Sequence, residues 1–106
     1  MRILLDESLP RKFAREFVGH QVQTVPQMGW AHKKNGELLR LAQPLFDVFI
    51  IIDRGLLYQQ NLRDVNLAII LLRARSNRLE DIKPFAPLIL ESLNTIQPGD
   101  VLQIEI

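Results

Sequence analysis

The chain has 106 residues, of which 47% are hydrophobic and 24% charged, a balance that predicts one soluble globular domain with a single core. It contains no cysteine, which excludes disulfides and cysteine-based metal sites and agrees with a reducing compartment. A net charge of +1 neither indicates nor excludes a nucleic-acid partner. No signal peptide is visible and every apolar run is too short to cross a bilayer, so we expect a cytoplasmic protein without a membrane partner.

The first ten residues predict a buried strand that ends at two acids. Residues 3–5 are apolar, and Asp6 and Glu7 follow them directly. Ser8 is a candidate N-cap for the next helix, with Pro10 in its first turn. Open α/β sheets bind their ligands at the carboxyl ends of the strands, so Asp6 is a candidate functional residue.

The next segments alternate between helix and strand. Residues 11–18 carry apolar side chains at helical spacing, and Gly19 is the expected stop. Residues 21–25 alternate polar and apolar, which predicts a half-exposed strand closed by Pro26. A loop with Gly29 and Trp30 follows.

A second helix is expected from Asn35 or Gly36 to Gln43. Glu37 lies in its first turn, where the helix dipole favours an anion. Residues 48–52 are apolar on both faces, as in a central strand of a parallel sheet, and Asp53 follows them directly.

The second half of the chain continues the alternation. Residues 56–61 predict a short helix or an ordered loop, and residues 67–72 a second core strand. Residues 79–93 have a helical apolar face but contain two prolines, so we expect a break near Pro84. Residues 101–106 alternate like a final edge strand, whose direction the pattern leaves open.

This order predicts an α/β fold in which one domain spans residues 1–106. The central sheet is expected to be mostly parallel, with four to five strands and with helices on both faces.

Three acids are expected at the carboxyl edge of this sheet. Asp6 and Asp53 each follow a core strand, and the helix that begins near Glu37 must start at the same edge. Carboxylates that converge repel one another unless a cation lies among them, and oxygen ligands suit Mg²⁺ or Mn²⁺. Such an ion can generate hydroxide and stabilise phosphodiester cleavage. Alternatively, Asp6 and Asp53 each cap the following helix or accept hydrogen bonds from the N–H groups of a turn.

The loop after residue 72 concentrates positive charge and has two interpretations. In the first, the loop binds nucleic-acid phosphate through Arg73, Arg75, Ser76, Asn77 and Arg78. Arg54, which follows Asp53, is expected to contribute to the same binding site. In the second, it is a solvated loop in which Asn77 caps the next helix and Arg73 pairs with an acid.

Several other residues favour structural roles. Glu7 is expected to face solvent or to pair with Arg11, and Asp47 to be a turn residue at the opposite end of the sheet. His20 lacks a partner at ligand spacing, and Trp30 is better explained by packing than by base stacking.

Four segments resemble the small PIN-like proteins of bacteria and archaea, which are similar to the toxin nucleases of VapBC-type toxin–antitoxin pairs. They are Ile3-Leu4-Leu5-Asp6-Glu7-Ser8-Leu9-Pro10, Gly36-Glu37-Leu38-Leu39, Phe46-Asp47-Val48-Phe49-Ile50-Ile51-Ile52-Asp53-Arg54 and Leu72-Arg73-Ala74-Arg75-Ser76-Asn77. The resemblance implies a compact PIN-like fold and RNA cleavage that depends on Mg²⁺ or Mn²⁺. The family's acids map to Asp6, Glu37 and Asp53, which are the implied catalytic and metal-binding residues.

Three hypotheses follow, of which the third is a purely structural interaction protein that binds neither metal nor RNA. The first is a metal-dependent endoribonuclease, whose role as a toxin would add an antitoxin partner and a homodimer. The second is a non-catalytic PIN-like module that binds RNA or protein. Its supporting feature is the absence of a fourth acid, because Arg75, Ser76 and Asn77 stand where the family commonly has one. A separate departure from the family's pattern is Ser8, which replaces the usual asparagine.

Overall fold

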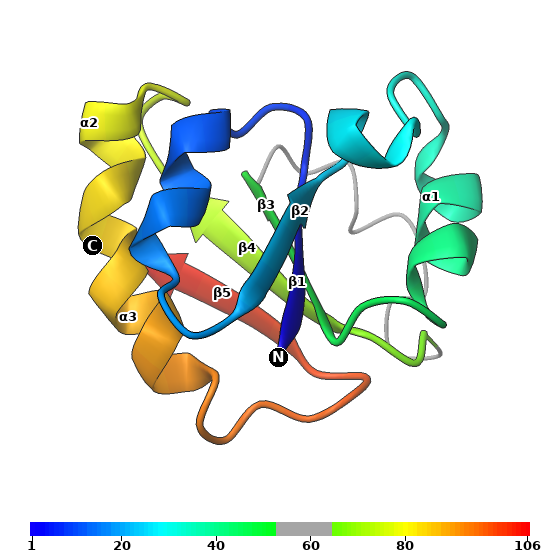
Figure 1. The fold of residues 1–106 in the computed structure, drawn as a ribbon. Helices are drawn as coiled ribbons and strands as arrows, with labels where there is room; N and C mark the ends of the chain where they lie inside the picture. The colour runs from blue at the N-terminus through cyan, green and yellow to red at the C-terminus, as the bar shows by residue number, and fades with distance from the viewer. Residues whose placement is uncertain (53–64) are drawn as a thin grey trace.

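The computed structural model describes residues 1–52 and 65–106, so the predictions for residues 56–61, Asp53 and Arg54 lie outside the described residues. Its sheet has five parallel strands in the order β2-β1-β3-β4-β5, which confirms the α/β prediction (Figure 1). The last strand, whose direction the sequence left open, is parallel to its neighbour. The strands are β1 (Arg2–Leu5), β2 (Gln21–Thr24), β3 (Val48–Ile52), β4 (Ala68–Arg73) and β5 (Val101–Glu105).

The central strands are apolar on both faces because helices cover both faces. Successive side chains of a strand point to opposite sides of the sheet. Ile3 and Leu5 of β1 therefore join one buried cluster, whereas Leu4 between them joins the other. The same division runs through β3 and β4, so the sheet separates two cores.

One face of the sheet is covered by η1 (Arg11–Glu16), α2 (Leu79–Ile82), η5 (Lys83–Phe85) and α3 (Ala86–Ser92) (Figure 1). Phe13 and Phe17 anchor the η1 segment, with their rings edge to face at a centroid distance of 5.1 Å. The expected helix over residues 11–18 is a 3₁₀ helix that ends at Glu16, and Val18 is 87% exposed rather than packed on the sheet. A 3₁₀ helix has about 3.0 residues per turn, so the α-helical spacing that placed Val18 on the buried face does not apply here.

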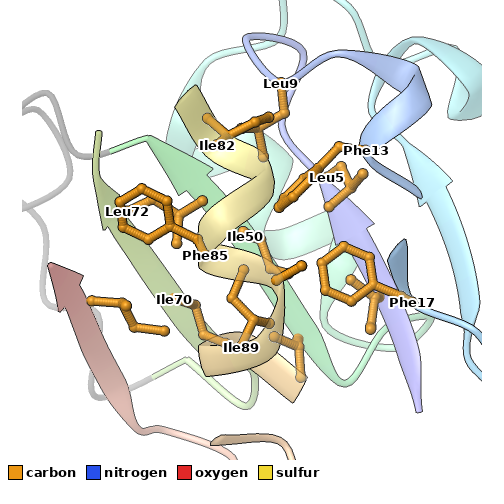
Figure 2. Packing of buried hydrophobic residues seen from close by; sticks show 14 of the residues in the cluster. Leu5, Leu9, Phe13, Phe17, Ile50, Ile70, Leu72, Ile82, Phe85 and Ile89 are labelled. Atoms are coloured by element: carbon orange, nitrogen blue, oxygen red, sulfur yellow. The ribbon is translucent and has the colours of Figure 1, made fainter. Parts of the chain in front are cut away.

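The predicted break in the long helix is confirmed. Pro84 lies in the first turn of η5 and Pro87 in the first turn of α3, where a missing backbone N–H leaves no helical hydrogen bond unmade. The two prolines thus divide one apolar face into consecutive short helices. Figure 2 shows Ile82, Phe85 and Ile89 of these helices directed into the same cluster.

The other face is covered by η2 (Pro26–Met28) and α1 (Asn35–Ala42), with bounds for α1 close to the predicted ones. Thr24 and Gln27 exchange two hydrogen bonds where β2 passes into η2. The Gln27 Oε1 atom accepts from the Thr24 N–H at 2.8 Å, and the Thr24 Oγ1 atom accepts from the Gln27 N–H at 3.2 Å. Trp30 packs edge to face on Phe46 at 6.1 Å, as the packing interpretation predicted.

The two edges of the sheet carry different acids. Asp47 and Asp100 precede strands and therefore lie at the amino edge, whereas Asp6 follows β1 at the carboxyl edge.

None of the helices within the described part of the chain is long and apolar enough to span a membrane.

Candidate functional site

The strand order creates a switch point between β1 and β3. From β1 the chain moves outward to β2 on one side, and from β3 it moves to β4 on the other side. Loops diverge at such a point and leave a crevice at the carboxyl ends of the two strands. The Asp6 backbone N–H donates to the Ile50 carbonyl at 3.0 Å, which places Asp6 beside β3. Asp53 follows β3 in the sequence but is outside the described residues.

The Asp6 side chain is half-buried and held by Ser8. Its Oδ2 atom accepts from the Ser8 hydroxyl at 2.6 Å and from the Ser8 backbone N–H at 3.2 Å. The sequence predicted Ser8 as the N-cap of η1, and this prediction is wrong. The N-cap residue is Pro10, and no side chain caps the helix. The Ser8 hydroxyl bonds to Asp6 within a local turn and so does not bond to a backbone N–H of the helix. Within the described residues, the Asp6 Oδ1 atom has no hydrogen-bond donor.

Glu7 joins the β1 loop to the loop after η2. Its Oε1 atom accepts from the His32 backbone N–H at 3.4 Å, rather than pairing with Arg11. His32 has a φ of 69°, an uncommon conformation for a residue with a side chain. This long, exposed hydrogen bond is the contact that the structure gives Glu7 among the described residues.

Glu37 lies in the first turn of α1, which starts at the carboxyl edge because it connects the end of β2 to the start of β3. The position in the first turn is as predicted. Its Oε1 atom lies 3.2 Å from the Lys33 Nζ atom, and the carboxylate side chain is 45% exposed. An exposed pair of this kind contributes about 0–1 kcal/mol, so a stronger ligand would displace the lysine.

No three His, Cys, Asp or Glu side chains within residues 1–52 and 65–106 gather closely enough to hold a metal ion. Asp53 is not among those residues, so the predicted set of Asp6, Glu37 and Asp53 is not tested as a whole.

The arginine-rich loop between β4 and α2 is largely occupied by structural contacts. Arg73 pairs with Glu105 at 3.2 Å, since the two residues are register partners at the ends of β4 and β5. Arg78 lies 3.6 Å from Glu80 and is the N-cap residue of α2, in place of Asn77. Both findings agree with a solvated loop for these two arginines.

Arg75 is the exception among the arginines of this loop. It is exposed, and within the described residues no ion pair or hydrogen bond involves its side chain. Among the predicted phosphate-binding residues that the structure describes, it is the one whose charge is most available to a ligand.

The β4–α2 loop is tied directly to the loop that carries Asp6. Asn77 donates from Nδ2 to the Ser8 carbonyl oxygen at 3.1 Å, across 69 residues of sequence. Ser76 donates to Asp81 and accepts the Arg78 N–H at 3.1 Å, which orders the same loop from within. Sequence reasoning missed the Asn77–Ser8 contact because a backbone carbonyl has no side-chain signature. Arg75 thereby lies on a loop fixed next to Asp6.

Comparisons with protein-family models, with curated proteins and with solved structures find no match to this chain. The PIN-like resemblance accordingly stays a prediction from the motifs quoted above.

Proposed function

We propose that this chain is a divalent-metal-dependent endoribonuclease of PIN-like type, in which Asp6, Glu37 and Asp53 hold Mg²⁺ or Mn²⁺. One observation carries the proposal. Asp6 lies at the switch point of a parallel sheet, with one carboxylate oxygen fixed by Ser8 and the other without a donor among the described residues. That is the position and the state in which a carboxylate is available to a cation.

The donor set fits a hard cation. All three predicted ligands are carboxylates, which suit Mg²⁺ and Mn²⁺ and not softer metals. Glu37 would exchange an exposed lysine for the ion, which costs little. When bound, the ion would lower the pKa of a coordinated water and neutralise charge on the phosphate.

The chain's own residues have separate tasks in this proposal. Ser8 restricts the rotation of the Asp6 carboxylate by binding one oxygen. Arg75 holds a phosphate by charge-assisted hydrogen bonds. The Asn77–Ser8 hydrogen bond keeps these two groups on adjoining loops.

The test is Mn²⁺-dependent cleavage of single-stranded RNA by the parent protein and by Asp6→Asn, Asp53→Asn and Asp47→Asn. Asp47 is the matched control, because it is an aspartate at the opposite edge of the sheet. We expect the first two variants to lose cleavage while their far-UV spectra stay unchanged, and Asp47→Asn to cleave like the parent. Equal cleavage by all four proteins would show that the acids are misassigned.

A second candidate is a non-catalytic module that binds RNA or protein through the same edge. The sequence of the β4–α2 loop favours it, because Arg75, Ser76 and Asn77 stand where PIN nucleases commonly have a further acid. Calorimetric titration separates the two candidates. RNA affinity without binding of Mg²⁺ or Mn²⁺ at millimolar concentration would favour the module.

A toxin role would add an antitoxin protein and a homodimer as partners. Light scattering coupled to size exclusion tests the homodimer, since a monomer at assay concentration would remove that part of the proposal.

A further inference from the structure

Two basic segments that are distant in the sequence pack together on one face of the sheet. Phe13 of η1 lies in the same buried cluster as Ile82 of α2, and Leu9 lies between them in Figure 2. The outer surfaces of η1 and of the α2–η5 helices therefore belong to one side of the molecule, which Figure 1 shows in blue and yellow.

This side carries exposed cations that have few partners. We define the basic face by six exposed residues: Arg11, Lys12, Arg15, Arg75, Arg78 and Lys83. Within the described part of the chain, Arg78 alone among them forms an ion pair, with Glu80 at 3.6 Å, and both side chains are largely exposed. The other five cations form no ion pair with any residue that the structure describes.

The charge of the face differs from that of the whole chain. Residues 9–16 and 74–85 contain these six cations and three acids, a net charge of +3, whereas the whole chain carries +1. One of the acids, Asp81, is bound by Ser76, and Glu80 is the partner of Arg78. Because the two segments carry +3 and the whole chain +1, the remainder of the chain carries −2. Positive charge is therefore concentrated in these two segments.

The basic face is continuous with the carboxyl edge of the sheet. Its η1 part begins five residues after Asp6, and its loop part is hydrogen-bonded to Ser8 through Asn77. A polyanion that reaches Asp6 therefore has a positively charged surface beside it.

We propose that the basic face binds the phosphate backbone of the RNA away from the cleaved bond, so that η1 extends the binding site beyond Arg75. The identity of the ligand rests on the proposed function. Several separated cations fit a chain of phosphates, each of which is neutralised by one lysine or arginine. An anionic membrane fits less well, because none of the large hydrophobic residues in the two segments is exposed.

The test uses anisotropy of a fluorescent single-stranded RNA in EDTA, so that binding is measured without cleavage. Lys12→Ala/Arg15→Ala removes two charges from the basic face. Lys34→Ala/Arg40→Ala is the matched control, because it removes one lysine and one arginine that are exposed at the start and end of α1, on the other side of the sheet.

We expect the first variant to reduce the slope of log affinity against log salt by about 1.4, since each phosphate contact to a single strand contributes about 0.7. The control should bind like the parent. Equal losses in both variants would indicate a general charge effect and overturn the proposal, as would an unchanged slope in the first variant.

This outcome is separable from that of the nuclease proposal. Failure of the parent to cleave RNA with Mn²⁺, together with a reduced slope in the first variant, would reject the nuclease and retain the basic face. Cleavage by the parent, together with the same salt slope in the parent and in the first variant, would retain the nuclease and reject the basic face.

Discussion

Asp6 directly follows a strand and Asp47 directly precedes one, and the two aspartates have different partners. Asp47 accepts from the Arg2 backbone N–H at 2.7 Å and from the Arg2 guanidinium at 3.3 Å. The backbone hydrogen bond is the main cause that lowers the pKa of Asp47 below its ordinary value, and the charge of Arg2 adds to it. Asp6 is instead bound by a neutral hydroxyl and a backbone amide, and its second oxygen accepts no hydrogen bond from the residues that the structure describes. The first arrangement fixes the strand ends, and the second leaves capacity for a ligand.

The Asp47 contact predicts a stability difference that depends on pH. Because the folded-state pKa of Asp47 is lowered, its contribution is present above the unfolded value and is lost as pH falls through the folded value. Asp47→Asn should reduce the free energy of unfolding by about 1 kcal/mol at neutral pH, a small value because the pair is partly exposed.

Urea unfolding of both proteins across the acid range measures this effect. The difference between them should shrink as pH falls below about 4. A difference that stays constant down to strongly acidic pH would contradict the role of the carboxylate.

The arginines of the β4–α2 loop predict a graded effect on RNA binding. Arg75→Ala should weaken affinity for single-stranded RNA several-fold and reduce the salt slope by about 0.7, the value for one phosphate contact. Arg73→Ala is the matched control and should have a smaller effect, because Arg73 already pairs with Glu105. If Arg73→Ala has the larger effect on the measured slope, the assignment of Arg75 fails.

At the scale of elements, η1 depends on its aromatic anchors. Phe13 is fully buried between the sheet and α2, whereas Val18 just beyond the helix is 87% exposed. Phe13→Ala should therefore reduce the free energy of unfolding by about 3–5 kcal/mol. Val18→Ala should change it by less than about 0.5 kcal/mol.

The measurement is the denaturant midpoint of unfolding for each variant. It applies when the slope of the unfolding free energy against denaturant concentration is unchanged. A loss below about 1 kcal/mol for Phe13→Ala would mean that η1 is not packed as described.

The elements that sequence predicted best are those in which one physical cause dominates. Residues 48–52 are apolar on both faces and could only be a buried strand, and α1 has both an amphipathic face and a proline after its end. The η1 segment was less well predicted, because the apolar spacing that includes Val18 fits an α-helix and cannot reveal a 3₁₀ helix.

Contacts that compete locally were the hardest to predict. Ser8 has the composition of an N-cap, but its hydroxyl binds Asp6 two residues earlier. Asn77 has the composition of a cap as well, but its amide donates to the Ser8 carbonyl across the fold. For both residues the sequence identifies a polar side chain with capacity to bond, and only the fold decides which partner is within reach.

At the scale of the whole molecule, the parallel sheet sorts the acids between its two edges. Every strand points the same way, so residues that follow strands gather at one edge and residues that precede them gather at the other. Asp6 belongs to the first group, and Asp47 and Asp100 belong to the second. The chain therefore contains its own control for any experiment that locates a cation.

Paramagnetic line broadening by Mn²⁺ in amide NMR spectra of the isotopically labelled protein tests the proposed metal site most directly. At substoichiometric Mn²⁺ we expect the amide signals of Asp6, Glu7 and Ser8 to broaden first and those of Asp47 and Asp100 to stay sharp. Broadening that begins at the amino edge, or no selective broadening at millimolar Mn²⁺, would contradict a metal site at the β1–β3 switch point.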